Sequence, residues 1–146
     1  MKILSPEFVR KGMIPSKYTC DELGISPPLK IENIPSGTKS VALIVDDPDA
    51  PSGDFVHWLI ANIDPVGEIG ENSIPEGSVQ GKNSAGKIGY IPPCPSSGTH
   101  RYCFKLYALS SKLNLNEGYS KTELLSEIKK TVIAQAELIG LYCRIK

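Results

Sequence analysis

The sequence predicts an all-β domain, built as a β-sandwich or a barrel and accompanied by one well-marked helix. Short strand-like runs recur along the chain, and turn-forming stretches rich in proline and glycine separate them roughly every ten residues. The 146 residues include 13 glycines and 12 prolines. Together these make up about 17% of the chain, against a usual level of about 12%, which favours many short strands over a helical bundle.

Five runs are typical of strands. The first alternates apolar and charged residues, and the second is continuously apolar, as expected of a strand buried on both faces. The third is rich in β-branched and aromatic residues, the fourth is long, and the fifth lies at the C-terminus. The runs cover Leu29–Glu32, Ser40–Val45, Phe55–Ile63, Arg101–Leu109 and Leu138–Ile145.

A capping box predicts that a helix begins after Ser120. In the segment Ser120–Glu123 the serine hydroxyl can accept from the backbone amide of Glu123, while the glutamate side chain reaches back to the serine amide. Apolar residues then follow at helical spacing, at Leu124, Leu125, Ile128, Val132 and Ala136. We expect this helix to pack on the sheet and to end at Ile139–Gly140.

Length and charge limit the classes of protein that fit. Residues 1–146 have the size of one domain, and the 16 basic and 16 acidic residues cancel. Nucleic acid and anionic membrane surfaces are therefore not the expected partners, because such binding depends on clustered Lys and Arg. No segment has the roughly 18–20 apolar residues of a membrane span, and Pro6 and Glu7 interrupt any signal sequence. The expected location is cytoplasmic.

The four cysteines leave their redox state open. Cys20, Cys94, Cys103 and Cys143 include no C-x-x-C pair, so a structural zinc site is not expected. In the cytosol of a mesophile all four would be thiols. In the cytosol of hyperthermophiles, however, disulfides persist, and an even number of cysteines can pair completely. We expect Cys20 and Cys94 to lie near the candidate site and the other two on strands.

One glycine-rich segment, residues 81–87, has the spacing of a phosphate-binding P-loop. Ile88 follows Lys87, so the hydroxyl that would bind Mg²⁺ is missing. Gly89 and the prolines at 92 and 93 also prevent the helix that must follow such a loop. Nucleotide binding is therefore not expected.

The two histidines, His57 and His100, are the strongest candidates for chemistry. Alternation along the strand predicts that Phe55, His57 and Leu59 share one face. The intervening Val56, Trp58 and Ile60 would then share the other. A rigid acidic turn, residues 46–51, precedes His57, and a proline-rich loop, residues 92–95, precedes His100. Convergence of these strand ends would form a small polar pocket.

The chain resembles the phosphatidylethanolamine-binding protein family, also called the Raf kinase inhibitor-like family, and most closely its short bacterial and archaeal branch. The motif Asp47-Pro48-Asp49-Ala50-Pro51 is followed by His57, by Gly89-Tyr90, by Pro93-Cys94-Pro95 and by Gly98-Thr99-His100-Arg101-Tyr102. The resemblance covers nearly the whole chain. It implies an antiparallel Greek-key β-sandwich with one or two short helices and a small anion pocket at one end.

The resemblance also implies which residues form that pocket. Asp47, His57 and His100 would carry the polar groups, Pro95 and the backbone around Cys94 would form a wall, and Tyr90 and Tyr102 would lie nearby. Asp49 would hold the loop, which Pro51 and Pro93 would shape. Neither a metal nor a cofactor is expected.

The function expected from these residues is binding rather than catalysis. We expect the pocket to bind a small anion or the phosphoryl headgroup of a phospholipid, and a set of Asp and His offers no nucleophile for acyl transfer. A thiol at Cys94 beside His100 would be the one exception. Asp47 should raise the pKa of both histidines, so that each donates to phosphate oxygens. The alternative is a protein-interaction module that inhibits a protease or kinase target. Whether the protein forms a homodimer stays open.

Overall fold

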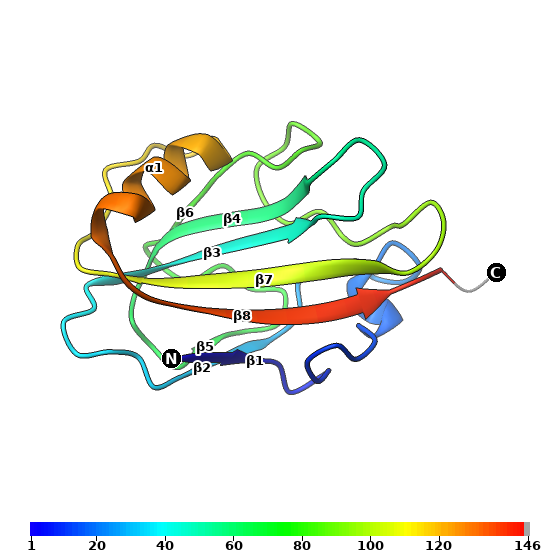
Figure 1. Ribbon diagram of the computed structural model, residues 1–146, viewed down its shortest axis with the longest axis horizontal. Helices are drawn as coiled ribbons and strands as arrows, with labels where there is room; N and C mark the ends of the chain where they lie inside the picture. The colour runs from blue at the N-terminus through cyan, green and yellow to red at the C-terminus, as the bar shows by residue number, and fades with distance from the viewer. Residues whose placement is uncertain (145–146) are drawn as a thin grey trace.

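Two antiparallel sheets form the framework of the protein in the computed structural model, which describes residues 1–144 (Figure 1). The larger sheet has the strand order β6-β4-β3-β7-β8, and the smaller has the order β1-β2-β5. The larger sheet comprises β3 (Ser40–Asp47), β4 (Phe55–Ile63), β6 (Val79–Gln80), β7 (His100–Leu109) and β8 (Val132–Tyr142). The smaller comprises β1 (Lys2–Leu4), β2 (Leu29–Glu32) and β5 (Glu68–Ile69). The predicted β-sandwich is confirmed.

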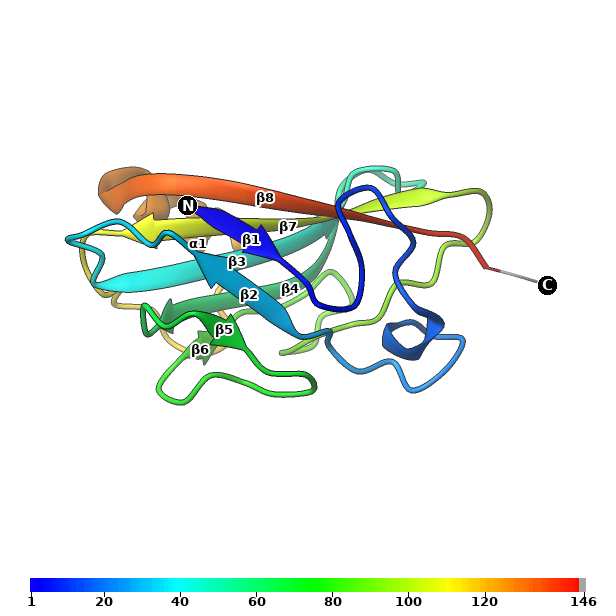
Figure 2. The same cartoon turned by 90° about the horizontal axis from the view of Figure 1, so that it is seen from below.

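Each face of the larger sheet buries its own apolar cluster. The smaller sheet covers one face, as the side view shows (Figure 2), and the cluster between the sheets includes Trp58, Tyr102 and Phe104. Helix α1 (Lys121–Thr131) covers part of the other face, where Leu124 and Ile128 pack with Leu59. Strand β3 lies in the middle of the sheet and all of its residues are buried, which explains its continuous apolar sequence.

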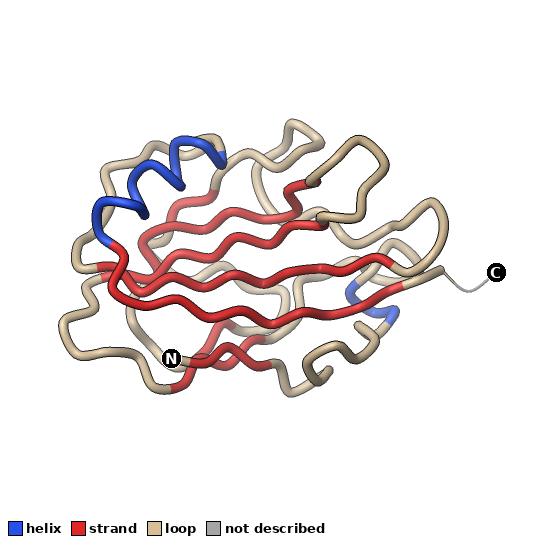
Figure 3. The backbone as a smooth tube through the Cα atoms, viewed as in Figure 1, coloured by secondary structure: helices blue, strands red, loops and turns tan. Residues whose placement is uncertain are grey.

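The capping box at the start of α1 is confirmed, but the predicted end of the helix is wrong. Ser120 accepts from the Glu123 amide and the Glu123 side chain accepts from the Ser120 amide. The helix ends at Thr131, and Val132 adopts extended backbone and begins β8 (Figure 3). Val132 and Ala136 are four residues apart. This spacing places both side chains on one face of a helix and also on one face of a strand. Pairing with β7 decides in favour of the strand.

The predicted last strand, Leu138–Ile145, is therefore placed too late. β8 runs from Val132 to Tyr142, and Ile145 lies outside the described residues. Gly140 belongs to this strand rather than to a helix end. A Cβ at this position would lie 2.6 Å from the Ile14 side chain, so glycine allows the N-terminal segment to pack against the sheet.

Strand β4 contains a bulge that overturns the predicted alternation of its side chains. Asp46 pairs with Val56 and Val45 pairs with Trp58, so His57 is the extra residue. Trp58 and Ile60 consequently join the cluster between the sheets, whereas Val56 and Leu59 join the cluster under α1. The bulge places His57 and Trp58 on the same side of the sheet.

A short 3₁₀ helix, η1 (Ser16–Tyr18), lies in the N-terminal segment next to the loop that precedes β7. Across residues 1–144, no helix combines the length and the apolar character needed to cross a membrane.

Candidate functional site

A cavity of about 190 Å³ lies at the end of the larger sheet where β3 ends and where β4 and β7 begin. Because β3 runs antiparallel to both neighbours, its C-terminal end meets the N-terminal ends of β4 and β7. The loop between β6 and β7 closes the cavity. Its lining residues are Asp47, Ala50, Pro51, Phe55, His57, Ile91, Pro92, Cys94, Pro95, Ser96, His100 and Tyr102.

Asp47 and His100 form a buried hydrogen-bonded pair at this site. The Nδ1 of His100 donates to Oδ2 of Asp47 over 2.7 Å, and the two side chains are 9% and 4% exposed. The other carboxylate oxygen of Asp47 accepts from the backbone amide of Asp49 at 2.8 Å. Both carboxylate oxygens of Asp47 thus have a partner, and the His100 ring is fixed with Nε2 as its free nitrogen.

Asp49 does not line the cavity but holds the acidic turn to β7. Its carboxylate accepts from the backbone amide, Nε and a terminal nitrogen of Arg101, at 2.8 to 2.9 Å. These hydrogen bonds from Arg101 lower the pKa of Asp49 to about 2. The turn that carries Asp47 is therefore anchored from outside the cavity.

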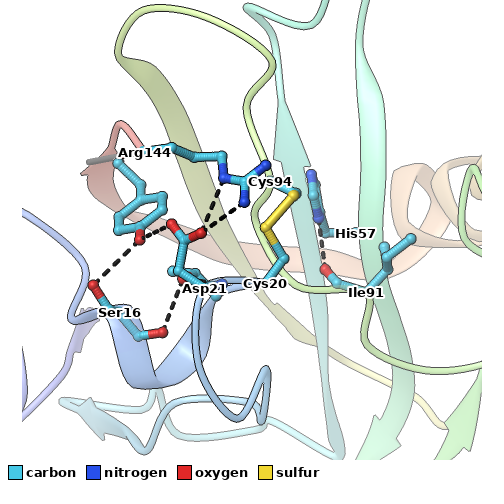
Figure 4. Close-up of a disulfide and its surroundings, with 9 residues drawn as sticks. Ser16, Cys20, Asp21, His57, Ile91, Cys94 and Arg144 are labelled. Atoms are coloured by element: carbon cyan, nitrogen blue, oxygen red, sulfur yellow. Dashed lines mark hydrogen bonds and ion pairs between the residues drawn. A yellow bond between two sulfur atoms is a disulfide. The ribbon is translucent and has the colours of Figure 1, made fainter. Parts of the chain in front are cut away.

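His57 enters the cavity from the bulge of β4. Its Nδ1 donates to the backbone carbonyl of Ile91 at 2.6 Å (Figure 4). The ring lies 4.9 Å from the ring of Phe55 and 5.3 Å from that of Tyr102, measured between centroids. Burial lowers the pKa of His57, although Asp47 acts in the opposite direction. The expectation of a raised pKa is therefore wrong for His57, because desolvation outweighs the nearby charge.

The two tyrosines that the resemblance placed near the pocket have different positions. Tyr102 lines the cavity, and the centroid of its ring lies 5.3 Å from that of His57 and 6.4 Å from that of His100. Tyr90 does not line it. The Tyr90 hydroxyl donates to the backbone carbonyl of Tyr18 at 2.8 Å, and its ring packs edge-on against Trp58 between the sheets. The neighbouring Ile91 contributes to the cavity instead.

A disulfide joins Cys94 in the cavity wall to Cys20 in the N-terminal segment (Figure 4). The Cα atoms of the two residues are 5.4 Å apart, and the Cys20 amide donates to the Pro93 carbonyl. A nucleophilic thiol at Cys94 is therefore excluded. Cys103 is a buried free thiol on β7, and Cys143 is a free thiol just after β8 rather than on a strand. Burial raises the pKa of Cys103 to about 11.

Comparison with known proteins identifies the family. A family model described as phosphatidylethanolamine-binding protein matches residues 4–143. The chain belongs to this family. It is 48% identical over 150 residues to a UPF0098 protein of Methanothermobacter thermautotrophicus, with 99% of each chain covered.

Two solved structures of similar proteins share the fold. A phosphatidylethanolamine-binding protein homologue of Chlamydia trachomatis, CT736, is 42% identical with a TM-score of 0.95, and the match covers 99% of this chain and 97% of that one. YbcL of E. coli, described as a member of the mammalian family, is 30% identical with a TM-score of 0.91, and the match covers 99% and 98%.

Several lining residues were not singled out as site residues in the sequence. These are Ala50, Phe55, Ile91, Pro92 and Ser96. Phe55 could have been identified as a lining residue from its spacing, because it lies two residues before His57 on the same face of the strand. Ile91 gave no such signal, because its contribution is a backbone carbonyl whose position depends on the fold of the loop.

Within residues 1–144, no group of three or more His, Cys, Asp or Glu side chains is arranged to hold a metal ion. The glycine-rich segment 81–87 offers no anion cradle among the described residues either. The amides of Ala85 and Lys87 donate to the side-chain oxygen of Asn83, so these donors are already used.

Proposed function

We propose that the cavity binds a small anion that carries a phosphoryl group, either free or as the headgroup of a phospholipid. The observation that supports this most is the convergence of His57, His100 and Asp47 from three strands in one small cavity of a family named for binding phosphatidylethanolamine. The cavity has room for roughly six water molecules, which suits a headgroup-sized ligand.

We assign two donors to the ligand, the Tyr102 hydroxyl and Nε2 of His100. Among the described residues the Tyr102 hydroxyl has no hydrogen-bond partner, and it belongs to a side chain that lines the cavity. Burial raises the pKa of this hydroxyl, so it stays protonated at neutral pH. The Nε2 of His100 can donate when that imidazole is protonated. Hydrogen bonds to a charged ligand are stronger than those between neutral groups.

We also propose that the protein binds its ligand without transforming it. The cysteine in the wall is held in a disulfide, and the prolines at 51, 92 and 95 contribute no amide that could form an oxyanion hole. The predicted cytoplasmic location stays a prediction. Disulfides persist in the cytosol of hyperthermophiles and in oxidising compartments outside the cytoplasm, and the bridge is compatible with both.

Calorimetric titration with inorganic phosphate tests the proposal, using Tyr102→Phe and Tyr90→Phe as a matched pair. Each variant removes one tyrosine hydroxyl, the first inside the cavity and the second outside it. We expect Tyr102→Phe to weaken phosphate binding about tenfold, as for the loss of one hydrogen bond to a charged group, and Tyr90→Phe to leave it unchanged. Absence of phosphate binding by the unmodified protein, or equal effects of both variants, would contradict the proposal.

A further inference from the structure

The disulfide between Cys20 and Cys94 is accessible from solvent, although it forms part of the cavity wall. Cys94 is exposed and lines the cavity, and Cys20 is half-buried. A disulfide with an exposed cysteine can be attacked by an external thiolate, and exposed disulfides are more readily reduced than buried structural ones. The bridge therefore places a reducible bond in the wall of the candidate site.

The Cys20 end of the bridge is held in place by other contacts. The carboxylate of the next residue, Asp21, accepts from the Tyr142 hydroxyl at the end of β8 and from Nε of Arg144 (Figure 4). The backbone amide of Cys20 also donates to the Pro93 carbonyl at 3.1 Å. These hydrogen bonds tie the N-terminal segment to the sheet and do not depend on the disulfide.

The Cys94 end has no such support. In the part of the chain that the structure describes, residues 94–99 form no hydrogen bond, and we call them the wall segment. Its first three residues, Cys94, Pro95 and Ser96, line the cavity. Pro95 is buried, whereas residues 96–99 are exposed. The disulfide and the packing of Pro95 therefore hold the wall segment in place, and a segment with so few contacts opens at low cost in free energy.

We propose that a dithiol reductant opens the Cys20–Cys94 disulfide and thereby weakens the binding of phosphoryl ligands in the cavity. This rests on the proposed function and adds the regulation of the same site. With the bridge open, the wall segment loses its tie to the N-terminal segment, whose own contacts remain. A ligand then has to order the wall segment when it binds, and this ordering costs conformational entropy.

The reduction is a two-step exchange. A thiolate of the dithiol attacks Sγ of Cys94, the bond between the two cysteine sulfurs breaks, and Cys20 leaves as a thiolate that takes up a proton. The second thiol of the reductant then displaces Cys94 from the mixed disulfide. Both cysteines end as thiols, and the dithiol ends as a disulfide.

Calorimetric titration with inorganic phosphate tests the proposal, using the unmodified protein before and after treatment with dithiothreitol. We expect the reduced protein to bind phosphate at least tenfold more weakly. Alkylation and mass spectrometry should find Cys20 and Cys94 newly reactive. The near-ultraviolet circular dichroism of Trp58, which is buried between the sheets, should stay that of a folded protein.

The other outcomes separate this proposal from the proposed function. Equal affinity of the oxidised and reduced proteins would overturn the redox control and leave the proposed function intact. Absence of phosphate binding by the oxidised protein would overturn the proposed function, and this control with it. A bridge that resists dithiothreitol in the folded protein, or a protein that unfolds as a whole on reduction, would also overturn the control.

Two cysteine variants identify the thiols that matter. Cys20→Ser removes the bridge without changing a lining residue, and Cys143→Ser, at a free thiol, is the matched control. We expect Cys20→Ser to bind phosphate as weakly as the reduced unmodified protein and to be unaffected by dithiothreitol. Cys143→Ser should lose affinity on reduction as the unmodified protein does. A Cys20→Ser variant with the affinity of the oxidised protein would contradict the proposal.

The reduction potential of the bridge gives an independent measurement on the unmodified protein. A ligand that prefers the closed bridge must stabilise it by the same factor, because the coupling between two equilibria is reciprocal. For a tenfold preference, saturating phosphate should lower the reduction potential by about 30 mV, measured in dithiothreitol redox buffers. A potential that saturating phosphate leaves unchanged would overturn the proposal.

Discussion

Arg101 fixes the acidic turn of the candidate site from the surface of the protein. It forms two side-chain hydrogen bonds and one backbone hydrogen bond with Asp49, whose own amide donates to Asp47. Asp49 therefore links the Arg101 side chain at the surface to the buried Asp47–His100 pair. The orientation of the buried Asp47 carboxylate depends on this supporting contact.

The pH dependence of stability should reveal this anchor. The pKa of Asp49 is about 2 in the folded protein and about 3.9 in an unfolded chain. The contribution of Asp49 is therefore complete above about pH 4 and is lost as the pH falls toward 2. Because the guanidinium of Arg101 is half exposed, we expect no more than about 1 kcal/mol.

Chemical denaturation of the unmodified protein and of Asp49→Asn at about pH 2 and about pH 6 measures this contribution. The difference in unfolding free energy between the two proteins should shrink at the lower pH. Asp64→Asn, at an exposed aspartate after β4, is the control and should show no such change. A difference that stays constant with pH for Asp49→Asn would show that the Arg101 pair does not stabilise the fold.

At the level of single residues, the sequence predicted positions better than protonation states. The spacing of the acidic turn, His57 and His100 indicated that these groups meet, and the hydrogen bond between His100 and Asp47 shows this contact. The lowered pKa of His57 could not be predicted, because it depends on burial in the folded chain, which outweighs the hydrogen bond to the Ile91 carbonyl that favours the imidazolium.

Among the elements, the glycine-rich segment 81–87 before β7 has the spacing of a phosphate-binding loop, but its first glycine has a packing role. Gly81 packs between Leu59 on β4 and Tyr119 before α1, where an added Cβ would lie 2.7 Å from the Tyr119 carbonyl oxygen and 2.8 Å from Leu59. The glycine is therefore required for packing, not for phosphate binding.

Gly81→Ala should destabilise the protein by about 1–3 kcal/mol, because backbone has to move to make room for the methyl group. Gly70→Ala is the matched control, since its Cβ would meet no atom closer than 3.5 Å. Thermal unfolding of both variants checks this. Equal midpoints for the two variants would mean that the loop tolerates the extra atom and that the packing argument is wrong.

Elements were predictable where one pattern dominated, as in the continuously apolar β3 and the capping box of α1. Two features were not. The end of α1 depends on the pairing of β8 with β7, and the bulge at His57 depends on the register of β4 against β3. Both are long-range pairings that leave no mark in local periodicity.

The disulfide is the main feature at the scale of the whole molecule. It joins residues 74 positions apart and connects the N-terminal segment to the wall of the cavity. Four cysteines allow three pairings if all are bridged, so the sequence could not assign this one. The turn spacing, in contrast, was sufficient to predict a β-sandwich or a barrel, and the family resemblance implied the sandwich.

Loss of the disulfide should lower the unfolding free energy by about 4 kcal/mol, because a long loop in the unfolded chain is released. Cys20→Ser tests this by denaturation, with Cys143→Ser, at a free thiol, as the control. Thiol counting under denaturing conditions should give two free thiols per chain. Four free thiols, or equal stability of the two variants, would contradict the bridge.

The claim that the cavity is an anion site is tested most directly by crystals soaked in phosphate. We expect density for one phosphate within hydrogen-bond reach, about 3 Å, of Nε2 of His100 and of the Tyr102 hydroxyl. The disulfide-linked loop should keep its position around the ligand. A cavity that holds only water at saturating phosphate, with the anion bound elsewhere on the surface, would contradict the account.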